Sequence, residues 1–168
     1  MKLSLVIPTY NERENIQKLV NRVQEEFKGN GIDGEIILVD DNSPDGTGII
    51  LDDLKRNQKN IKIIHRSGKL GLSSAVIEGW KIAEGEVLGV MDADLSHPPD
   101  KIKDLFFMIE SGRADFAIGS RYTLNGEIRG WNLNRKIMSK MATLVARVYT
   151  KVKDPMTGFF MIKREVIE

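Results

Sequence analysis

The chain has 168 residues, of which 41% are hydrophobic and 29% are charged, and its formal net charge is +1. A chain of this length suits one globular domain that buries roughly 70% of its unfolded surface, so we expect a single domain over residues 1–168. The absence of cysteine excludes a disulfide framework and a thiolate metal site. No apolar run approaches the roughly 20 residues of a membrane-spanning helix, and no signal peptide is visible. We therefore expect no transmembrane segment.

Short apolar runs alternate with amphipathic segments along the chain. The apolar runs predict six strands, and the segments with apolar residues at helical spacing predict five helices between them. The predicted strands cover residues 3–8, 35–41, 61–65, 86–92, 114–120 and 158–163. The predicted helices cover residues 47–58, 71–84 and 133–150, a segment that Asn11 caps, and a segment that begins at Pro98 and Pro99. Because single helices separate the strands, we expect an α/β fold with a largely parallel sheet and right-handed crossovers.

Polar turns follow the first five predicted strands. In chain order they contain PTYNERE, DDNSPDG, RSGKLGL, DAD and GSRY. The carboxyl ends of parallel strands meet at one edge of the sheet, which is where α/β folds bind ligands. Any one turn is explained by the connection that it makes, but five such turns are more than connectivity needs. The pattern predicts a ligand crevice at this edge, in which Lys69 either meets a phosphate or is solvated.

The segment VLGVMDADLSHPP, residues 87–99, ends a predicted buried strand in two carboxylates, Asp92 and Asp94. Paired carboxylates make a hard-oxygen site that suits Mg²⁺ or Mn²⁺ holding a diphosphate. The alternative is a turn followed by a helix that Pro98 opens, because aspartate also favours turns.

Residues 129–153 hold seven of the 25 lysines and arginines and no acidic residue, so the rest of the chain carries 18 basic against 24 acidic side chains. Such a segment suggests an anionic partner, either a phosphate, a lipid headgroup or a nucleic acid. The predicted helix 133–150 has an apolar stripe, formed by Ile137, Met141, Leu144, Val145 and Val148, and beside it a basic stripe, formed by Lys136, Lys140, Arg147 and Lys151. Two interpretations stay open: ordinary packing with a solvated edge, or a helix that lies on an anionic bilayer.

The motifs PTYNEREN, VDDNSPDGT, KLGL, MDADLSHPP, GSRY and TGFF occur in the order seen in the GT-A glycosyltransferases of family 2, which the chain resembles over essentially its whole length. Within that family it is most similar to the dolichol- and polyprenol-phosphate mannose synthases. The resemblance implies a Rossmann-like, mostly parallel sheet with helices on both faces. It also implies a metal-dependent, inverting transfer of a sugar, mannose from GDP-mannose, to a dolichyl or polyprenyl phosphate. The expected location is cytoplasmic and peripheral on an anionic membrane surface, with no nucleic acid as partner.

By this resemblance, the nucleotide sugar contacts residues at the strand ends. They are Pro8, Tyr10, Glu12, Val39, Asp41, Asp92, Ala93, Asp94, Ser96 and Arg121. The Tyr10 ring is expected to pack on the nucleoside, and the Glu12 carboxylate to accept from its N–H groups. The alternative for Glu12 is an acid in the first turn of a helix, where it complements the dipole. Asp41 is expected to accept from the base or ribose, while its neighbour Asp40 is interpreted as structural.

The resemblance assigns the divalent cation, Mg²⁺ or Mn²⁺, to Asp92, Asp94 and Ser96, with Asp94 favoured as the direct ligand. Histidine can bind metal, but His97 is favoured in a structural role behind the ligands. His65 stands inside an apolar strand and is interpreted as a core histidine with its hydrogen bonds satisfied.

The acceptor phosphate is expected among Arg121, Arg135 and Ser139, and the expected catalytic residues are Asp94, Arg121 and Arg135. Arg135 and Ser139 share a helix face at i, i+4 spacing, and a plain polar helix face stays the alternative for both. A lipid monophosphate is already an anion at neutral pH, because its second pKa is near 6, so it needs no strong general base. Asp154 is a candidate for a positioning or base role.

Other classes of function stay open. A nucleotidyltransferase would usually begin with a Gly-rich phosphate loop, but PTYNERE contains neither glycine nor lysine. A second alternative is a nucleotide-sugar-binding or membrane-docking module without activity. Related chains continue past the equivalent of Glu168 with basic residues for the diphosphate, so we expect the domain to be truncated at its C-terminal end. A third alternative keeps the family and changes the donor to UDP-glucose or another nucleotide sugar.

Overall fold

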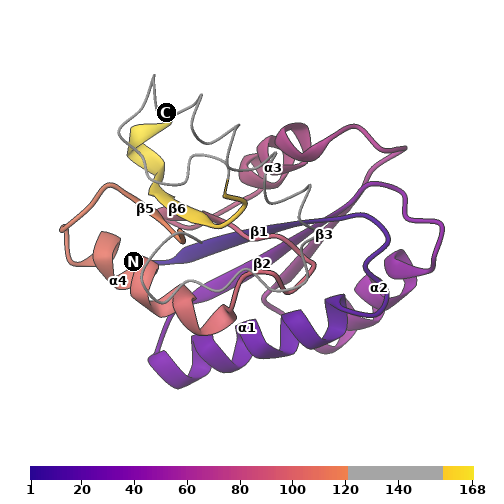
Figure 1. Cartoon of the computed structure of the whole chain (residues 1–168), viewed down its shortest axis with the longest axis horizontal. Coiled ribbons are helices and arrows are strands. Elements are labelled where there is room, and N and C mark those ends of the chain that lie inside the picture. The colour runs from indigo at the N-terminus through magenta and orange to yellow at the C-terminus, as the bar shows by residue number, and fades with distance from the viewer. Residues whose placement is uncertain (121–156) are drawn as a thin grey trace, which may run out of the picture.

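The computed structural model describes residues 1–120 and 157–168, and within them six strands form one sheet in the order β3-β2-β1-β4-β6-β5 (Figure 1). The strands are β1 Leu3–Thr9, β2 Gly34–Asp40, β3 Ile61–His65, β4 Val87–Val90, β5 Phe116–Ile118 and β6 Phe160–Lys163. β1 pairs in parallel with β2 and β4, and β2 pairs in parallel with β3. β6 lies antiparallel between β4 and β5. The expected α/β fold with a mostly parallel sheet is confirmed, and β6 is its antiparallel member.

Helices cover both faces of the sheet (Figure 1). Those within the described residues are α1 Ile16–Asn30, α2 Thr47–Asn57, α3 Leu72–Lys81 and α4 Ile102–Glu110, with 3-10 turns at Pro99–Lys101 and Arg164–Val166. The larger core cluster joins α1, α2 and α4 to one face, and a smaller cluster joins α3 to the other. The expected helices on both faces are therefore confirmed. The predicted helix 133–150 lies outside the described residues.

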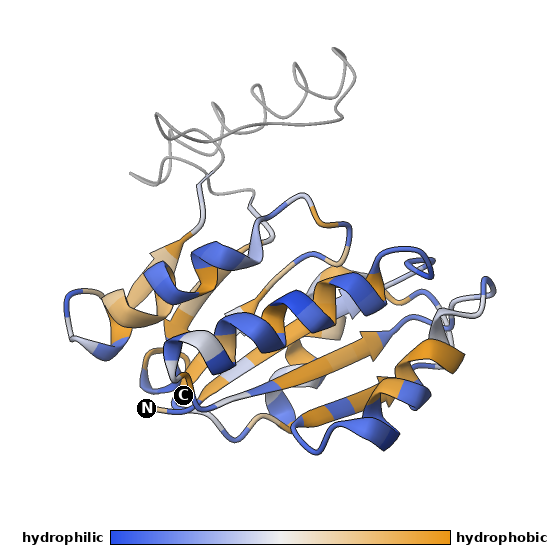
Figure 2. Cartoon of the chain, turned by 90° about the horizontal axis from the view of Figure 1, so that it is seen from below, coloured by the Kyte–Doolittle hydropathy of each residue, from blue (hydrophilic) through white to orange (hydrophobic). Residues whose placement is uncertain are grey.

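Alternate residues of each strand point to opposite faces of the sheet. Leu5 and Ile7 of β1 belong to the core cluster on the α1 side, whereas Val6 packs with Ile37 and Ala75 on the α3 side. Figure 2 shows hydrophobic strands beneath helices whose outward surfaces are largely hydrophilic. Because parallel strands that are covered on both faces are apolar at nearly every position, they appear in the sequence as continuous apolar runs. This explains why the sequence predicts β1 and β2 so closely.

Two predicted helix boundaries are wrong. Asn11 does not cap α1, because its φ is 59° and the helix begins only at Ile16. α3 ends at Lys81 rather than at residue 84, and the Glu84 N–H donates to Glu35 Oε1 at 2.7 Å instead of continuing the helix. A tertiary hydrogen bond therefore replaces the local one that the periodicity predicts.

Polar side chains form a network at the amino ends of the parallel strands, here called the amino-edge network. Its members are Lys2, Ser4, Glu35, Lys62 and Glu84. Ser4 Oγ donates to Glu35 Oε1 at 2.6 Å, and Lys62 Nζ lies 2.8 Å from Glu35 Oε2. Lys2 and Lys62 also pair with Glu84, at 2.7 and 2.5 Å. Burial alone would raise the pKa of Glu35, but hydrogen bonds from Lys62, Ser4 and the Glu84 N–H hold it below its ordinary value. Hydrogen bonds from the two lysines lower the pKa of Glu84 to about 2.

Candidate functional site

The loops that follow β1, β2 and β4 each hold one non-glycine residue with a left-handed backbone. These residues are Asn11, Asn42 and Leu95, with φ of 59°, 58° and 59°. Asparagine tolerates this region, but leucine rarely adopts it, and such residues cost of order 1–3 kcal/mol. Each lies next to a residue that the sequence analysis places in the site. Strain held at three loops of one edge supports the location predicted for a ligand crevice.

Glu12 is fixed between the loops after β1 and β2. Its N–H donates to Thr47 Oγ1 at 3.0 Å, and its Oε2 accepts from Asn15 Nδ2 at 2.9 Å. α1 begins at Ile16 and carries no acidic residue in its first turn. The alternative interpretation of Glu12 as a first-turn helix acid is therefore wrong.

The electrostatic surroundings of Glu12 join it to the Asp-Ala-Asp segment. Burial raises the pKa of Glu12, and a hydrogen bond from Asn15 opposes this. Neighbouring carboxylates raise the pKa further; in order of effect they are Asp94, Asp45 and Asp92. Negative charge thus gathers where the loops after β1, β2 and β4 meet.

Asp40, the last residue of β2, and Asp41, which follows it, have separate surroundings, because successive side chains in an extended segment point to opposite faces. Asp40 accepts from Ser43 Oγ at 2.6 Å and from the Ser43 N–H at 3.2 Å. Its role in the turn matches the structural interpretation. Asp41 is 7% exposed and accepts from Arg66 Nη1 at 2.6 Å. Its second oxygen accepts from the N–H groups of Leu70 and Gly71, at 3.1 and 3.3 Å.

Arg66 is a residue of this edge that the sequence analysis misses. Its side chain is 2% exposed, and besides Asp41 it contacts Ser74 Oγ at 2.6 Å and the Gly71 carbonyl at 3.2 Å. Its Nε lies 3.3 Å from Glu78 Oε2. Arg66 and Asp41 together hold the loop of residues 66–71 against the end of β2. A signal was available in the sequence: Asp41 directly follows β2 and Arg66 directly follows β3. The two residues of opposite charge therefore occupy equivalent positions after two neighbouring strands.

Lys69, in the loop that Arg66 holds, lies over the Tyr10 ring with its Nζ 4.1 Å from the ring centroid. Tyr10 is 37% exposed. A cation over an aromatic face is held by the ring quadrupole. Lys69 is itself exposed, so the solvated interpretation stays open and its contact with a phosphate stays a prediction.

Three other predicted contact residues offer little side chain to a ligand. Pro8 is half-buried in β1. Val39 and Ala93 are 0% and 5% exposed, and both pack in the core. The predicted contacts of Val39 and Ala93 therefore depend on their backbone atoms.

The carboxylates of the Asp-Ala-Asp segment are open to solvent to different degrees. Asp94 is exposed, and its Oδ1 accepts from the Ser96 N–H at 2.9 Å across the left-handed Leu95. Asp92 is half-buried. Among the described residues, no lysine or arginine nitrogen lies within 4 Å of either carboxylate, and Asp92 pairs only with a histidine. The turn alternative accounts for Asp94 Oδ1 but not for a second carboxylate without a cation.

His97 lies behind Asp92. The ring is 3% exposed, its Nε2 lies 3.4 Å from Asp92 Oδ2, and its centroid lies 5.4 Å from that of Phe159. This is the position expected for a histidine with a structural role behind the ligands. His65 differs from its prediction, because its side chain is 46% exposed and Nε2 lies 3.0 Å from Asp52 Oδ1. The core interpretation of His65 is wrong, because β3 is an edge strand of the sheet and His65 is the final residue of that strand.

The donor set fits a divalent cation held together with phosphate. The described residues contain no group of three histidine or acidic side chains arranged to hold a metal. Mg²⁺ and similar ions do not need one, because they bind through one or two carboxylates, waters and substrate phosphates. Asp92 and Asp94 supply such carboxylates, and exposed Ser96 supplies a hydroxyl.

The last described segment returns to this site through Thr157, Gly158 and Phe159. An added Cβ at Gly158 would overlap the Asp92 carboxylate. The sequence analysis uses TGFF only as part of a resemblance and misses this contact. Four other predicted residues, Arg121, Arg135, Ser139 and Asp154, lie outside the described residues, as does the basic segment 129–153.

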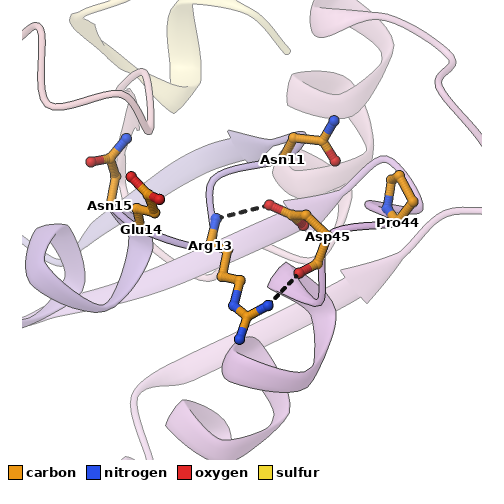
Figure 3. A pocket seen from close by; sticks show the side chains of 6 residues that line it. All are labelled: Asn11, Arg13, Glu14, Asn15, Pro44 and Asp45. Carbon is orange, nitrogen blue, oxygen red and sulfur yellow. Dashed lines mark hydrogen bonds between the residues drawn. The ribbon is translucent and has the colours of Figure 1, made fainter.

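A polar hollow of about 550 Å³ opens between the loops after β1 and β2 (Figure 3). Its lining residues are Asn11, Arg13, Glu14, Asn15, Pro44 and Asp45. Within it the Arg13 N–H donates to Asp45 Oδ2 at 3.2 Å, and Arg13 Nη1 donates to the Asp45 carbonyl at 3.3 Å (Figure 3). Both bonds tie the loop after β1 to the loop after β2, directly after Glu12 in the chain.

Fold and site together define a class: an α/β domain whose carboxyl edge carries an acidic strand end beside an aromatic and a carboxylate after the first strand. Residues 4–168 match the model of the family described as Glycosyl transferase family 2. The chain belongs to this family.

Two relatives show which members of the family this chain is similar to. The chain is 45% identical to a dolichol-phosphate mannosyltransferase of Pyrococcus furiosus, over 100% of this chain and 48% of that protein. It is 39% identical to a polyprenol monophosphomannose synthase of Mycolicibacterium smegmatis, over 98% of this chain and 62% of that protein. The chain thus spans about half to two thirds of the length of these relatives.

The fold also matches a solved structure, that of the mannosyltransferase PcManGT from Pyrobaculum calidifontis in complex with GDP-Man and Mn²⁺. The TM-score is 0.68 at 18% identity, over 98% of this chain and 45% of that one. The expected GT-A architecture is confirmed by this likeness. No helix within the described residues is long and apolar enough to cross a membrane.

Proposed function

We propose that this chain forms a metal-dependent, inverting glycosyltransferase domain that moves mannose from GDP-mannose to a dolichyl or polyprenyl phosphate. The observation that carries the proposal is the acidic strand end. Asp92 and Asp94 follow β4, act electrostatically on Glu12, and have no described lysine or arginine within 4 Å. The relatives named as dolichol- and polyprenol-phosphate enzymes support the acceptor, and the GDP-Man and Mn²⁺ bound by PcManGT are consistent with the donor and ion.

The donor nucleotide is held by the loops after β1 and β3. Tyr10 offers a partly exposed ring for the nucleoside, and Glu12 offers acceptor oxygens for its N–H groups. Lys69, which lies over the same ring, supplies a cation for the phosphates. Asp41 keeps the loop after β3 in place by accepting hydrogen bonds from Arg66 and from two backbone N–H groups of that loop.

The transfer needs charge placement more than proton removal. An oxygen of the acceptor phosphate bonds to the anomeric carbon while the bond to the diphosphate breaks, so GDP leaves and the configuration inverts. The acceptor is already an anion at neutral pH, so no side chain has to deprotonate it. Asp92, Asp94 and Ser96 are the residues that would hold the cation, which when bound neutralises charge on the leaving diphosphate. Arg121, Arg135 and Ser139 are proposed around the acceptor phosphate.

We further propose that the domain works on an anionic membrane surface. The support is the acceptor's lipid nature and the seven basic residues, without an acid, in residues 129–153. Wild-type chain should sediment with phosphatidylserine vesicles at low salt, and less at high salt. A variant with Gln at Lys136, Lys140, Arg147 and Lys151 should sediment less. A wild-type chain that stays in the supernatant would remove the membrane part of the proposal.

The decisive test of the function is a transfer assay. GDP-mannose and a short polyprenyl phosphate are incubated with the chain and Mn²⁺ or Mg²⁺, with UDP-glucose and other GDP- and UDP-sugars as parallel donors. We expect lipid-extractable product from GDP-mannose and none after EDTA. If turnover occurs only with another nucleotide sugar, the proposed donor is wrong and that sugar replaces it. Nucleotide-sugar binding without turnover would favour the binding module, and turnover in EDTA would contradict metal dependence.

A further inference from the structure

Gly158 lies against the carboxylate of Asp92. A Cβ built on Gly158 would overlap the Asp92 carboxyl group, whose two oxygens and carbon are the three heavy atoms nearest to it. The nearest obstacle is therefore the charged group itself. A side chain at position 158 must therefore move Asp92 or move the segment that leads into β6.

The segment leading into β6 has little freedom to move. Thr157 Oγ1 donates to the Gly119 carbonyl at 3.0 Å and accepts from the Phe159 N–H at 3.2 Å. The Gly119 N–H donates to the Phe159 carbonyl at 2.9 Å. Phe159 is 1% exposed, and its ring leaves no space for a Cβ at Gly119. The end of β5 and a buried ring thus fix Gly158 in place.

His97, in the loop after β4, contacts the same carboxylate as Gly158, which lies before β6. Its Nε2 lies 3.4 Å from Asp92 Oδ2, and its ring packs on Phe159 at a centroid distance of 5.4 Å. The ring is 3% exposed. The final torsion of an aspartate side chain is broad and poorly determined by its own backbone. Neighbours that limit it are therefore needed wherever a carboxylate has to keep one orientation.

We propose that Gly158 and His97 are positioning residues for Asp92, which set the orientation in which its carboxylate meets a divalent cation and nucleotide. The inference rests on the proposed function for the use of Asp92. It adds that the carboxyl-terminal segment, from the far side of β4, is part of the metal site although it supplies no ligand atom. Residues that orient a metal ligand typically change metal affinity about 10–100-fold when replaced.

The first experiment measures the affinity of the full chain for GDP with and without Mn²⁺ by calorimetry. Gly158→Ala should weaken the Mn²⁺-dependent affinity about tenfold, while GDP binding in EDTA stays the same. His97→Phe keeps a ring for Phe159 and removes Nε2, and it should weaken the same affinity in the same way. Gly29→Ala in α1 is the matched control, because an added Cβ there meets nothing within 4 Å.

A double-mutant cycle separates this role from general damage to the fold. Melting temperatures of Gly158→Ala are compared in the wild-type and Asp92→Ala backgrounds, both in EDTA. If Gly158 acts through the Asp92 carboxylate, the loss in melting temperature should largely disappear when that carboxylate is absent. This readout needs no metal, and it remains measurable if Gly158→Ala is too unstable for calorimetry.

The outcomes are distinguishable. Equal losses of melting temperature in both backgrounds, or Mn²⁺-dependent affinities within twofold of wild type for folded Gly158→Ala and for His97→Phe, would overturn the inference. If Asp94→Ala binds GDP with unchanged Mn²⁺ dependence, the metal site of the proposed function fails instead, whatever the cycle gives.

Discussion

The two ends of the parallel strands differ in how completely their acidic side chains are paired with basic ones. In the amino-edge network, Glu35 and Glu84 pair with lysines, and the pKa of each lies below its ordinary value. At the carboxyl edge, Glu12 lies among other carboxylates and burial raises its pKa. Asp92 and Asp94 have no described lysine or arginine within 4 Å. The amino end compensates its charge and stabilises the fold. At the carboxyl end Asp41 is paired with Arg66, but Glu12, Asp92 and Asp94 have no described lysine or arginine partner, as expected where a cationic ligand supplies one.

Backbone strain follows the same division. The left-handed Asn11, Asn42 and Leu95 all follow carboxyl ends of strands. Strain and like charge both lower stability, and proteins keep them mainly where function requires it. Substitutions at the two ends should therefore separate binding from stability.

The largest expected effect is that of Asp94→Ala at the carboxyl edge. We expect loss of Mn²⁺-dependent GDP binding, because the exposed carboxylate is the favoured ligand of the ion, with little change in the free energy of unfolding. Asp92→Ala should weaken binding as well, to a smaller extent. Calorimetry with Mn²⁺ and with EDTA measures both, and Asp53→Ala on the surface of α2 is the control. Retention of wild-type Mn²⁺ dependence by Asp94→Ala would disprove the assignment.

The next effect is on stability. Glu35→Gln removes the charged acceptor of Ser4 and Lys62 and should lower the free energy of unfolding by about 2 kcal/mol, since hydrogen bonds to charged groups are worth roughly 1.5–3 kcal/mol. Urea denaturation measures this, and GDP binding should stay unchanged. Glu25→Gln on the exposed side of α1 should have no measurable effect. A binding defect in Glu35→Gln would show that the two ends are not independent.

A smaller effect of opposite sign is expected for Glu12→Gln. Removing this charge relieves its repulsion from Asp94, Asp45 and Asp92, so stability should rise by roughly 0.5 kcal/mol, within the usual range for relieving a functional compromise. GDP affinity should fall, because an acceptor for nucleoside N–H groups becomes a weaker one. If the substitution destabilises the chain, the charge at the carboxyl edge is compensated after all.

The pH dependence of stability gives the smallest separable effect. The folded pKa of Glu84 is about 2, below its ordinary value of 4.5, and that of Glu35 is also lowered. Such carboxylates contribute stability above pH 4.5 that is lost as the pH falls toward 2. Melting temperatures between pH 5 and 2 should drop, and Glu35→Gln should reduce the slope. A slope equal to that of wild type would mean that Glu35 is not part of this titration.

The sequence predicted most of the fold because strands covered on both faces are apolar throughout. Residues 61–65 match β3 exactly in extent, and the Asp-Ala-Asp segment follows β4 as predicted. The antiparallel direction of β6 could not be predicted from the sequence, because the alternation of strands and helices does not determine the direction of the final strand in the chain. The prediction that His65 is buried failed for a related reason, because an apolar run does not show that its strand lies at the edge of the sheet.

The site was predicted less completely, because several of its contacts join residues far apart in the chain. Asp41 was chosen from its place after β2, but its partner Arg66 follows β3 and is recognisable only when both strands are in register. Gly158 gave no signal of its own, since the absence of a side chain has meaning only beside the Asp92 carboxylate. Local patterns predict where a strand ends, and the packing decides what meets there.

The account's central claim is that the carboxyl edge binds a divalent cation together with a nucleotide diphosphate. The most direct measurement is a crystal structure of the chain grown with Mn²⁺ and GDP, with diffraction data collected at the manganese absorption edge. The account predicts an anomalous peak within bonding distance of an Asp94 oxygen, bridging to the GDP phosphates, with Asp92 beside it. GDP bound at this edge without such a peak, or a peak at acids elsewhere on the chain, would contradict it.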